Sequence, residues 1–315
     1  MDAARSPGLV LALALLLTAC PGPPDDTGSD LDPNTVPLAG MCDLSVDYGG
    51  FVVQSAGDRT GVEGKVADGV VPQLVLEEIG NEGDCRLLRR NNPFCDPTCD
   101  RGQVCDFDGT CLPYPSNQDM GIVTIAGLST AVEMEPVFPG NTYFDTALSD
   151  PPFEPGALVT LTVPGPGSEP IVLHGVGVEI LSGLDPEWKI NEGQDLVVNW
   201  AAPAEGSRAH VDLTVSIDQH GATPGLLTCS FEDDGEGTVP AAIIDQLISS
   251  GVTGFPTGTI TRQTVDKADV LDGCMDFAVS NPVQMEVDVV GFTPCVNQND
   301  CPDGLTCNIE LQICE

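Results

Sequence analysis

Alternation of apolar and polar residues is the most regular pattern in this chain. It is clearest over residues 211–217 (VDLTVSI) and 283–289 (VQMEVDV), where every second residue is apolar. Because successive side chains of a strand point to opposite faces, this alternation predicts strands with one buried and one solvated face. Antiparallel β-sandwiches are built from such strands. Strand-like runs bounded by Gly and Pro turns occur at 48–54, 61–67, 73–79, 121–126, 158–163, 171–174, 178–181, 195–200, 210–217, 226–231, 257–264 and 283–290.

One helix interrupts this pattern, over about 239–250. Thr238 can cap its start, Pro240 suits its first turn and Gly251 stops it. Its apolar residues fall on one face, which we expect to pack against the edge of a sheet. These residues are Ile243, Ile244, Leu247 and Ile248.

The spacing of these elements predicts an all-β fold with two β-sandwich-like domains and two small disulfide-rich modules. The first β-domain is expected at 41–176, with a cysteine-rich insertion at 95–111, and the second at 177–292. A C-terminal cysteine-rich module follows at 293–315. Two separate small domains in place of one over 41–176 are the alternative.

The start of the chain is typical of an exported protein. Residues 9–17 are uncharged and rich in Leu and Ala, and this run is too short to cross a bilayer, which needs about 20 apolar residues. Leu17-Thr18-Ala19-Cys20 closes the run and resembles the lipobox of bacterial lipoproteins. That resemblance implies a signal peptide at 1–19 and a mature chain that begins with a lipidated Cys20. A signal peptide that is cleaved elsewhere is the alternative.

Residues 20–40 are rich in Pro, Gly and Asp and show no apolar period, which predicts a disordered acidic tether. The lipoprotein resemblance implies attachment to the membrane through two or three acyl chains, which suffice for stable anchoring. Pro21-Gly22 follows Cys20 without the Asp that retains some bacterial lipoproteins in the inner membrane. The outer membrane is therefore expected, and its periplasmic and surface faces both stay open.

The cysteine count agrees with lipidation. The chain has 13 Cys, so a lipid on Cys20 leaves twelve that can all pair in an oxidising compartment. Eight form two clusters that share Cys-x-x-Gly-x-x-Cys: Cys95, Cys99, Cys105 and Cys111, then Cys295, Cys301, Cys307 and Cys314. Cys42 and Cys85 could join the ends of one region, and Cys229 and Cys274 could join the strands on either side of the helix.

Segments this short need cross-links in order to fold, because they cannot bury enough apolar surface. Four cysteines allow three pairings, and spacing does not choose between them. The clusters resemble the small EGF-like or dickkopf-like modules of secreted proteins, and this resemblance implies first-to-third and second-to-fourth disulfides. A zinc site with four thiolates is the alternative, although neither cluster contains Cys-x-x-Cys.

A second resemblance concerns the β-domains. Residues 196–200 (LVVNW), followed by Pro203, are similar to the second-strand pattern of fibronectin type III and related immunoglobulin-like domains. This resemblance implies a sandwich fold and favours a scaffold or binding role.

Charge narrows the classes of partner. The chain carries 48 acidic against 11 basic residues, a net charge of −37. Phosphate backbones and anionic headgroups repel such a chain, which excludes nucleic-acid binding and leaves the lipid as the means of membrane attachment.

Candidate catalytic residues are few. The three histidines, His174, His210 and His220, form no metal-binding spacing. Residues 127–131 (GLSTA) approach the nucleophile elbow but lack its final Gly, and Gly175-Val176-Gly177 lacks the third Gly of a dinucleotide site. Two acidic stretches, 232–236 and 106–109, could supply oxygen ligands to calcium, but neither completes an EF-hand.

These observations predict a lipid-anchored cell-envelope protein that acts as a non-catalytic binding, adhesion or structural module. We expect no cofactor and no resident metal. The expected partners are the membrane, through the lipid, and a protein or glycan ligand. A calcium-stabilised extracellular binding protein and an extracellular hydrolase with an unfamiliar site are the alternatives.

Overall fold

The computed structural model describes residues 31–56, 60–165, 169–203, 207–217 and 225–315. The predicted signal peptide, Cys20 and the predicted tether up to residue 30 lie outside this range. Residues Leu31–Glu315 form one compact unit, and its fold is all-β, as predicted. No helix among the described residues is long and apolar enough to span a membrane.

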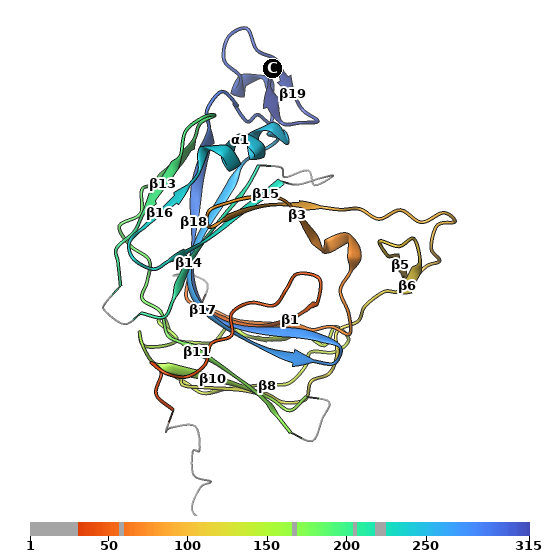
Figure 1. Ribbon diagram of the computed structural model, residues 1–315, viewed down its shortest axis with the longest axis vertical. Coiled ribbons are helices and arrows are strands. Elements are labelled where there is room, and N and C mark those ends of the chain that lie inside the picture. Colours follow the sequence, from red (N-terminus) through yellow and green to blue (C-terminus); the bar gives the residue numbers. More distant parts are fainter. Residues whose placement is uncertain (1–30, 57–59, 166–168, 204–206, 218–224) are drawn as a thin grey trace, which may run out of the picture. The chain divides into compact units, whose positions relative to one another are not determined.

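A ten-stranded sheet organises the chain (Figure 1). Its strand order is β3-β4-β15-β14-β17-β18-β1-β2-β9, and β12 pairs with β18 outside this path. These strands are β1 (Asp47–Gln54), β2 (Gly61–Val66), β3 (Leu76–Glu82), β4 (Cys85–Arg90), β9 (Tyr143–Asp145), β12 (Glu187–Ile190), β14 (His210–Ser216), β15 (Gly225–Glu232), β17 (Thr257–Val270) and β18 (Gly273–Val289).

The described residues also form a four-stranded sheet and three strand pairs. The four-stranded sheet contains β7 (Val123–Ala126), β8 (Val132–Met134), β10 (Leu158–Val163) and β11 (Ile171–Val176). The three strand pairs are β13 (Leu196–Asn199) with β16 (Glu236–Val239), β5 (Gln103–Cys105) with β6 (Cys111–Pro113), and β19 (Cys307–Asn308) with β20 (Ile313–Cys314). The helical segments are α1 (Ala241–Ser249) and the 3-10 turns η1 (Pro72–Leu74) and η2 (Gln298–Asp300).

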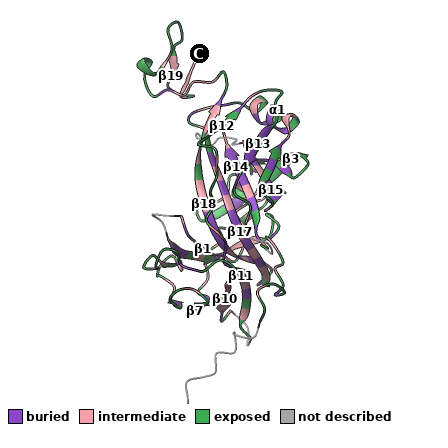
Figure 2. Ribbon diagram, turned by 90° about the vertical axis from the view of Figure 1, so that its left-hand side faces the viewer, coloured by how far each residue is buried: buried purple, intermediate pink, exposed green. Residues whose placement is uncertain are grey.

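Two hydrophobic cores lie against this sheet, in agreement with two sandwich-like regions. The first core lies between the four-stranded sheet and β1, β2 and β18, and it includes Phe51, Leu161 and Phe277. The second core lies under β13, β16 and α1, and it includes Trp188 and Leu213. Figure 2 shows that buried residues concentrate along β14, β17 and β18.

The two β-domains were predicted to meet at 176/177, but both cores lie against the same large sheet. The β17–β18 hairpin is continuous from Thr257↔Glu286 to Val270↔Gly273, and its ends contribute to different cores. Strands β3 and β4 come from the first predicted domain, yet β4 pairs with β15 of the second. Apolar alternation predicts that a strand has a buried face, but it does not identify the sheet that covers this face.

Most predicted strands are present, with some differences at their ends. The run at 73–79 divides into η1 and β3. The run at 178–181 is no strand, and its Leu181 N donates to the Asn281 side chain at 2.8 Å instead of to a neighbouring strand. Strand β18 begins ten residues before the predicted 283, although its residues 275–280 (MDFAVS) already alternate between the first core and the other face.

Helix α1 confirms the prediction, except at its start. Ile243, Ile244 and Leu247 are buried, and the helix contacts the edge strand β3. Its N-cap is Pro240, and the Asp195 carboxylate accepts the Ala241 N–H at 2.7 Å in place of the expected cap from Thr238. Thr238 is unavailable because it pairs with Val197 in strand β16.

Six disulfides link all twelve cysteines that the structure describes. Both modules have the predicted first-to-third and second-to-fourth pairing: Cys95–Cys105, Cys99–Cys111, Cys295–Cys307 and Cys301–Cys314. This pairing leaves no free thiolates there for the alternative zinc sites. Six disulfides are typical of a protein that folds outside the cytoplasm.

The expected pairing of the remaining four cysteines is wrong. Cys42 pairs with Cys274, and Cys85 pairs with Cys229. Cys85 and Cys229 lie opposite each other in the β4–β15 ladder, although they are 144 residues apart in sequence. The disulfide therefore depends on the register of these two strands. Sequence spacing contains no information about such a register.

Candidate functional site

One face of the large sheet is left outside both cores, and we call it the polar face. In Figure 1 the sheet curls from β3 and β15 through β14 and β17 to β1, while β13, β16, β10 and β11 lie outside the curl. Side chains that alternate with the core residues therefore point to the inside of the curl. On β14 they are Asp212, Thr214 and Ser216, each half-buried between fully buried neighbours.

A pocket lies on the polar face, where β18, β1, β2 and β9 meet. It has a volume of about 590 Å³. Gly50, Val52 and Ala278 line it along β1 and β18, and a Cβ on Gly50 would collide with the Asp276 backbone. Glycine at this position therefore permits the close approach of β1 to β18.

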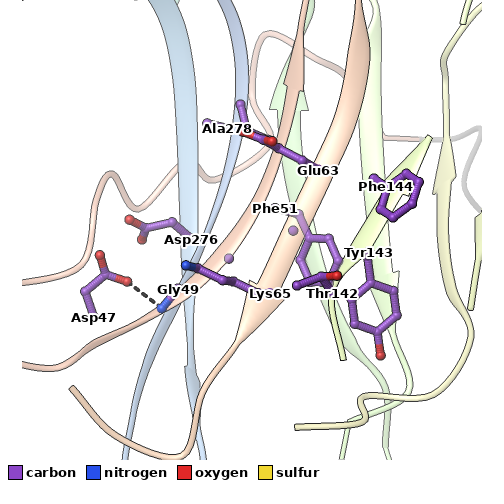
Figure 3. Close-up of a pocket in the computed structure, with 13 residues that line it drawn as sticks. Asp47, Gly49, Phe51, Glu63, Lys65, Thr142, Tyr143, Phe144, Asp276 and Ala278 are labelled. Carbon is purple, nitrogen blue, oxygen red and sulfur yellow. Dashed lines mark hydrogen bonds between the residues drawn. The ribbon is translucent and has the colours of Figure 1, made fainter. Parts of the chain in front are cut away.

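The two ends of this pocket differ in chemistry. Figure 3 shows Asp47, Asp276 and Lys65 at one end and Phe144 at the other. The Phe144 side chain is 56% exposed, whereas its neighbour Tyr143 is buried on the opposite side of β9. The pocket thus combines charged groups with an aromatic surface, a combination that suits polar ligands with an apolar face.

Burial of a carboxyl group distinguishes the charged end. Desolvation, together with the negative charge of Asp47, raises the pKa of Asp276 from 3.8 to about 6. The hydrogen bond from Cys42 N at 2.8 Å and the charge of Lys267 partly oppose this rise. Asp276 is therefore a carboxyl group whose charge changes slightly below neutral pH.

Tyr143 supports the pocket from the core side. Its hydroxyl accepts a hydrogen bond from Met120 N at 2.8 Å and donates to Gly121 O at 3.2 Å. Its ring contacts Phe51 with centroids 5.4 Å apart. Burial raises the pKa of the Tyr143 hydroxyl above 10.0, so it stays a neutral hydrogen-bonding group.

Residues 38–42, which we call the strap, cross the polar face beside the pocket. The strap is tied to the β17–β18 hairpin by hydrogen bonds and by the disulfide from Cys42 to Cys274. The hydrogen bonds are Ala39 N to Asp266 at 2.9 Å, Gly40 N to Val265 O at 3.1 Å, Lys267 Nζ to Met41 O at 2.7 Å, and Cys42 N to Asp276 at 2.8 Å. The described end of the predicted tether is thus part of the fold.

A smaller pocket lies next to the strap, on the same face. It has a volume of about 210 Å³ and is lined by Leu38, His210, Asp212, Ser230 and Gln263, among others. Asp212 Oδ2 accepts a hydrogen bond from Gln263 Nε2. The other carboxylate oxygen, Oδ1, is buried and makes no hydrogen bond within the described part of the chain.

The two histidines that the structure describes, His174 and His210, lie on strands of different sheets. His210 is exposed and lines the smaller pocket, and His174 lies on β11, where its Nδ1 is 3.3 Å from Thr160 Oγ1. His220 lies outside the described residues. Residues 127–131 connect β7 to β8 without the helix that follows a nucleophile elbow, and Ser129 Oγ donates to Pro151 O at 3.2 Å.

The acidic stretches are engaged in structural contacts. Asp233, from the stretch 232–236, forms a buried ion pair with Arg262 at 2.8 Å and accepts the Trp200 indole N–H at 2.9 Å. Asp108 accepts the Thr110 N–H at 2.8 Å and the Thr110 hydroxyl, and these hydrogen bonds lower its pKa. These contacts use oxygens that a calcium ion would need.

Three clusters of potential metal ligands occur among the described residues. Each includes disulfide-bonded cysteines, and the third combines Cys42 and Cys274 with Asp276. Oxidised sulfurs are not thiolates and so do not hold a metal ion.

Sequence reasoning missed Asp276, Lys65 and Phe144. Asp276 was detectable in principle, because it is a carboxylate inside the apolar stretch 274–279, where burial shifts a pKa. Lys65 and Phe144 become part of the site only through the order β1-β2-β9 of the sheet.

Known proteins show little similarity to this chain. No family model matches the chain, and no curated protein matches it. Among solved structures, a Ca²⁺-stabilised adhesin of an Antarctic bacterium that binds ice is 12% identical, with 78% of this chain and 75% of that chain covered, at a TM-score of 0.17. A tetra-tandem repeat from the extending region of a large adhesion protein is also 12% identical, with 78% and 76% covered, at a TM-score of 0.17. Such a TM-score defines no shared fold.

Proposed function

We propose that this chain is a lipid-anchored cell-envelope protein that acts as a non-catalytic binding or adhesion module, with the pocket of the polar face as its binding site. The observation that carries this proposal is the pocket itself. It joins an exposed aromatic ring, Phe144, to three carboxylates and the amine of Lys65 in a volume of about 590 Å³. Sites of this size commonly hold small ligands or parts of larger ones.

The residues that line the pocket support binding without catalysis. Its lining contains no His, Cys or Ser, so it holds no Ser–His or Cys–His pair of the kind that activates a nucleophile. Protein and glycan ligands both fit its mixed apolar and polar character. The acidic stretches do not favour the calcium-stabilised alternative, since Asp233 and Asp108 already accept hydrogen bonds.

The strap supports attachment through the N-terminus. A lipid on Cys20 would place the tether between the membrane and Pro33, whose carbonyl Arg208 binds, and the contacts with the β17–β18 hairpin follow from Ala39. The Cys42–Cys274 disulfide would then transmit tension from the membrane into the large sheet through a covalent bond.

The attachment is tested by intact-mass analysis of the mature protein and by membrane fractionation. We expect an acylated N-terminal Cys20, and we expect Cys20→Ser to move the protein to the soluble fraction. A mature N-terminus elsewhere, or an unlipidated protein in the membrane fraction, would contradict lipid anchoring.

The binding site is tested with the purified mature chain on glycan arrays and against a displayed peptide library. Val52→Phe fills the pocket, and Val172→Phe makes the same change on the exposed side of β11. Phe144→Ala removes the aromatic surface, and Phe138→Ala removes a ring that is 86% exposed and lines no identified pocket of the described residues. Binding that survives both pocket variants, or that is lost equally in both controls, would refute the proposed site.

A further inference from the structure

We propose that the hydroxyl-rich part of the polar face, next to the pocket, binds the chain of a neutral polysaccharide. This inference rests on the proposed function and names the class of ligand. Five threonines of three adjacent strands carry it: Thr214 on β14, Thr228 on β15, and Thr257, Thr259 and Thr261 on β17.

Strand register places these hydroxyls in rows across the sheet. Thr228 lies opposite Thr214, and Thr214 lies opposite Thr259. Thr259 lies opposite Gln284 of β18, which extends this row with an amide. The flanking rows contain Ser216 beside Thr257, and Asp212 beside Thr261. Neighbouring strands are about 4.8 Å apart, so the row is a closely spaced series of donors and acceptors.

The same face of β18 leads from the row towards the pocket, past the buried Ser280. Along β18, the side chains on this face are Gln284, Pro282, Ser280 and Ala278, and Ala278 lines the pocket. Six residues separate Gln284 from Ala278, a distance of roughly 20 Å in a strand. An extended ligand could therefore contact the threonine rows and the pocket at the same time.

Unsatisfied polar atoms lie on this surface. Thr228 Oγ1 and Asp212 Oδ1 are buried and make no hydrogen bond within the described part of the chain. Buried polar groups in native proteins almost always have a partner, which here can be water or a ligand.

Charge selects a neutral ligand. Charges of both signs flank the threonine rows, since Arg86 lies opposite Thr228 and Glu286 lies opposite Thr257. The net charge of the chain is −37, so the protein field repels anionic polymers. A cationic polymer would be attracted to the many acidic surfaces and would gain nothing specific from hydroxyl groups. Neutral sugars match the face, because each hydroxyl both donates and accepts hydrogen bonds.

The test compares chain lengths. Isothermal titration of the mature chain uses cellobiose and cellohexaose, and maltose and maltohexaose, since only the hexasaccharides can reach from the pocket to Thr259. We expect at least one hexasaccharide to bind tenfold or more tightly than its disaccharide. The double variant Thr214→Val/Thr259→Val should abolish this gain and leave disaccharide binding unchanged.

The matched control is Thr124→Val/Thr162→Val, which makes the same change in a directly opposed Thr pair of β7 and β10. This control should keep the gain, and circular dichroism should show both double variants folded. Equal affinity for both chain lengths, an equal loss in the control, or tighter binding of polygalacturonate would overturn the inference. If a peptide binds the pocket but no glycan does, the proposed function stands and this inference falls. If nothing binds the pocket, both fall.

Discussion

Replacing Arg262 by Met should strongly destabilise the second core. Arg262 and Asp233 form an ion pair in which the side chains are 1% and 2% exposed. Arg262 Nη2 also donates to Asp233 Oδ1 at 2.9 Å and to Ala201 O at 2.7 Å. The Nε–Oδ2 contact at 2.8 Å is an ion pair without a well-directed hydrogen bond. Arg262→Met therefore leaves a buried carboxylate without its counter-charge.

The loss of unfolding free energy depends on which buried groups each variant leaves without a partner. Removal of one partner of a buried ion pair destabilises a protein by about 3–5 kcal/mol, because the other charge stays buried. The double variant Arg262→Met/Asp233→Leu removes both charges, and leaves mainly the Trp200 indole N–H without its acceptor. An unsatisfied buried donor costs about 1–3 kcal/mol. We therefore expect the double variant to be more stable than Arg262→Met by roughly 2 kcal/mol.

Equilibrium unfolding in urea with the disulfides intact measures these differences. Trp188 and Trp200 are the two tryptophans of the chain and both belong to the second core, so their fluorescence reports on it. Arg208→Met is the control, because Arg208 donates to the carbonyls of Pro33 and Val36. An Arg262→Met effect within 1 kcal/mol of this control, or a double variant less stable than Arg262→Met, would refute the reasoning.

Three further predictions concern other parts of the molecule. The pKa of Asp276 in the folded state is about 6, above its ordinary 3.8. Between these pH values the folded state binds more protons than the unfolded state, so the protein loses stability as pH rises through this window. Asp276→Asn should thus stabilise the protein at pH 8 but not at pH 4, and thermal melts that show the reverse would contradict it. The double variant Cys42→Ser/Cys274→Ser opens a loop of 232 residues. It should lower the unfolding free energy by up to roughly 5 kcal/mol in urea titrations, whereas a loss below about 1 kcal/mol would show that the strap holds without it. Millimolar calcium should leave the melting temperature unchanged, because hydrogen bonds and an ion pair already occupy Asp233 in the stretch 232–236; a clear rise would restore the calcium site.

Local sequence patterns predicted the features that depend on neighbouring residues. Alternation located β14 within one residue of its observed end, because each of its side chains faces either the core or the polar face. The disulfides of the two modules followed from a resemblance, and their cysteines are at most 13 residues apart in each pair. In such features the decisive contacts lie within one short segment.

Features that depend on strand order were not predictable in the same way. The pairing of Cys85 with Cys229 requires β4 to lie beside β15, and the pocket requires β1 to lie between β18 and β2. Both arrangements join segments more than a hundred residues apart. Composition and alternation are unchanged by a different order of the same strands, so they favour no particular order.

The β17–β18 hairpin explains why the two cores and the polar face form a single structure. Each of its strands has one side in a core and the other on the polar face, so the same residues that stabilise the fold also space the threonine rows. The strap is bound to this hairpin through Asp266, Lys267 and the Cys42–Cys274 disulfide. Tension from an N-terminal anchor would therefore act on the strands that pair over their full length, and not on the short strand β9 that carries Phe144. A ligand held in the pocket would contact the same hairpin through Asp276 and Ala278 of β18, so ligand and strap would both act on the strands that pair over their full length.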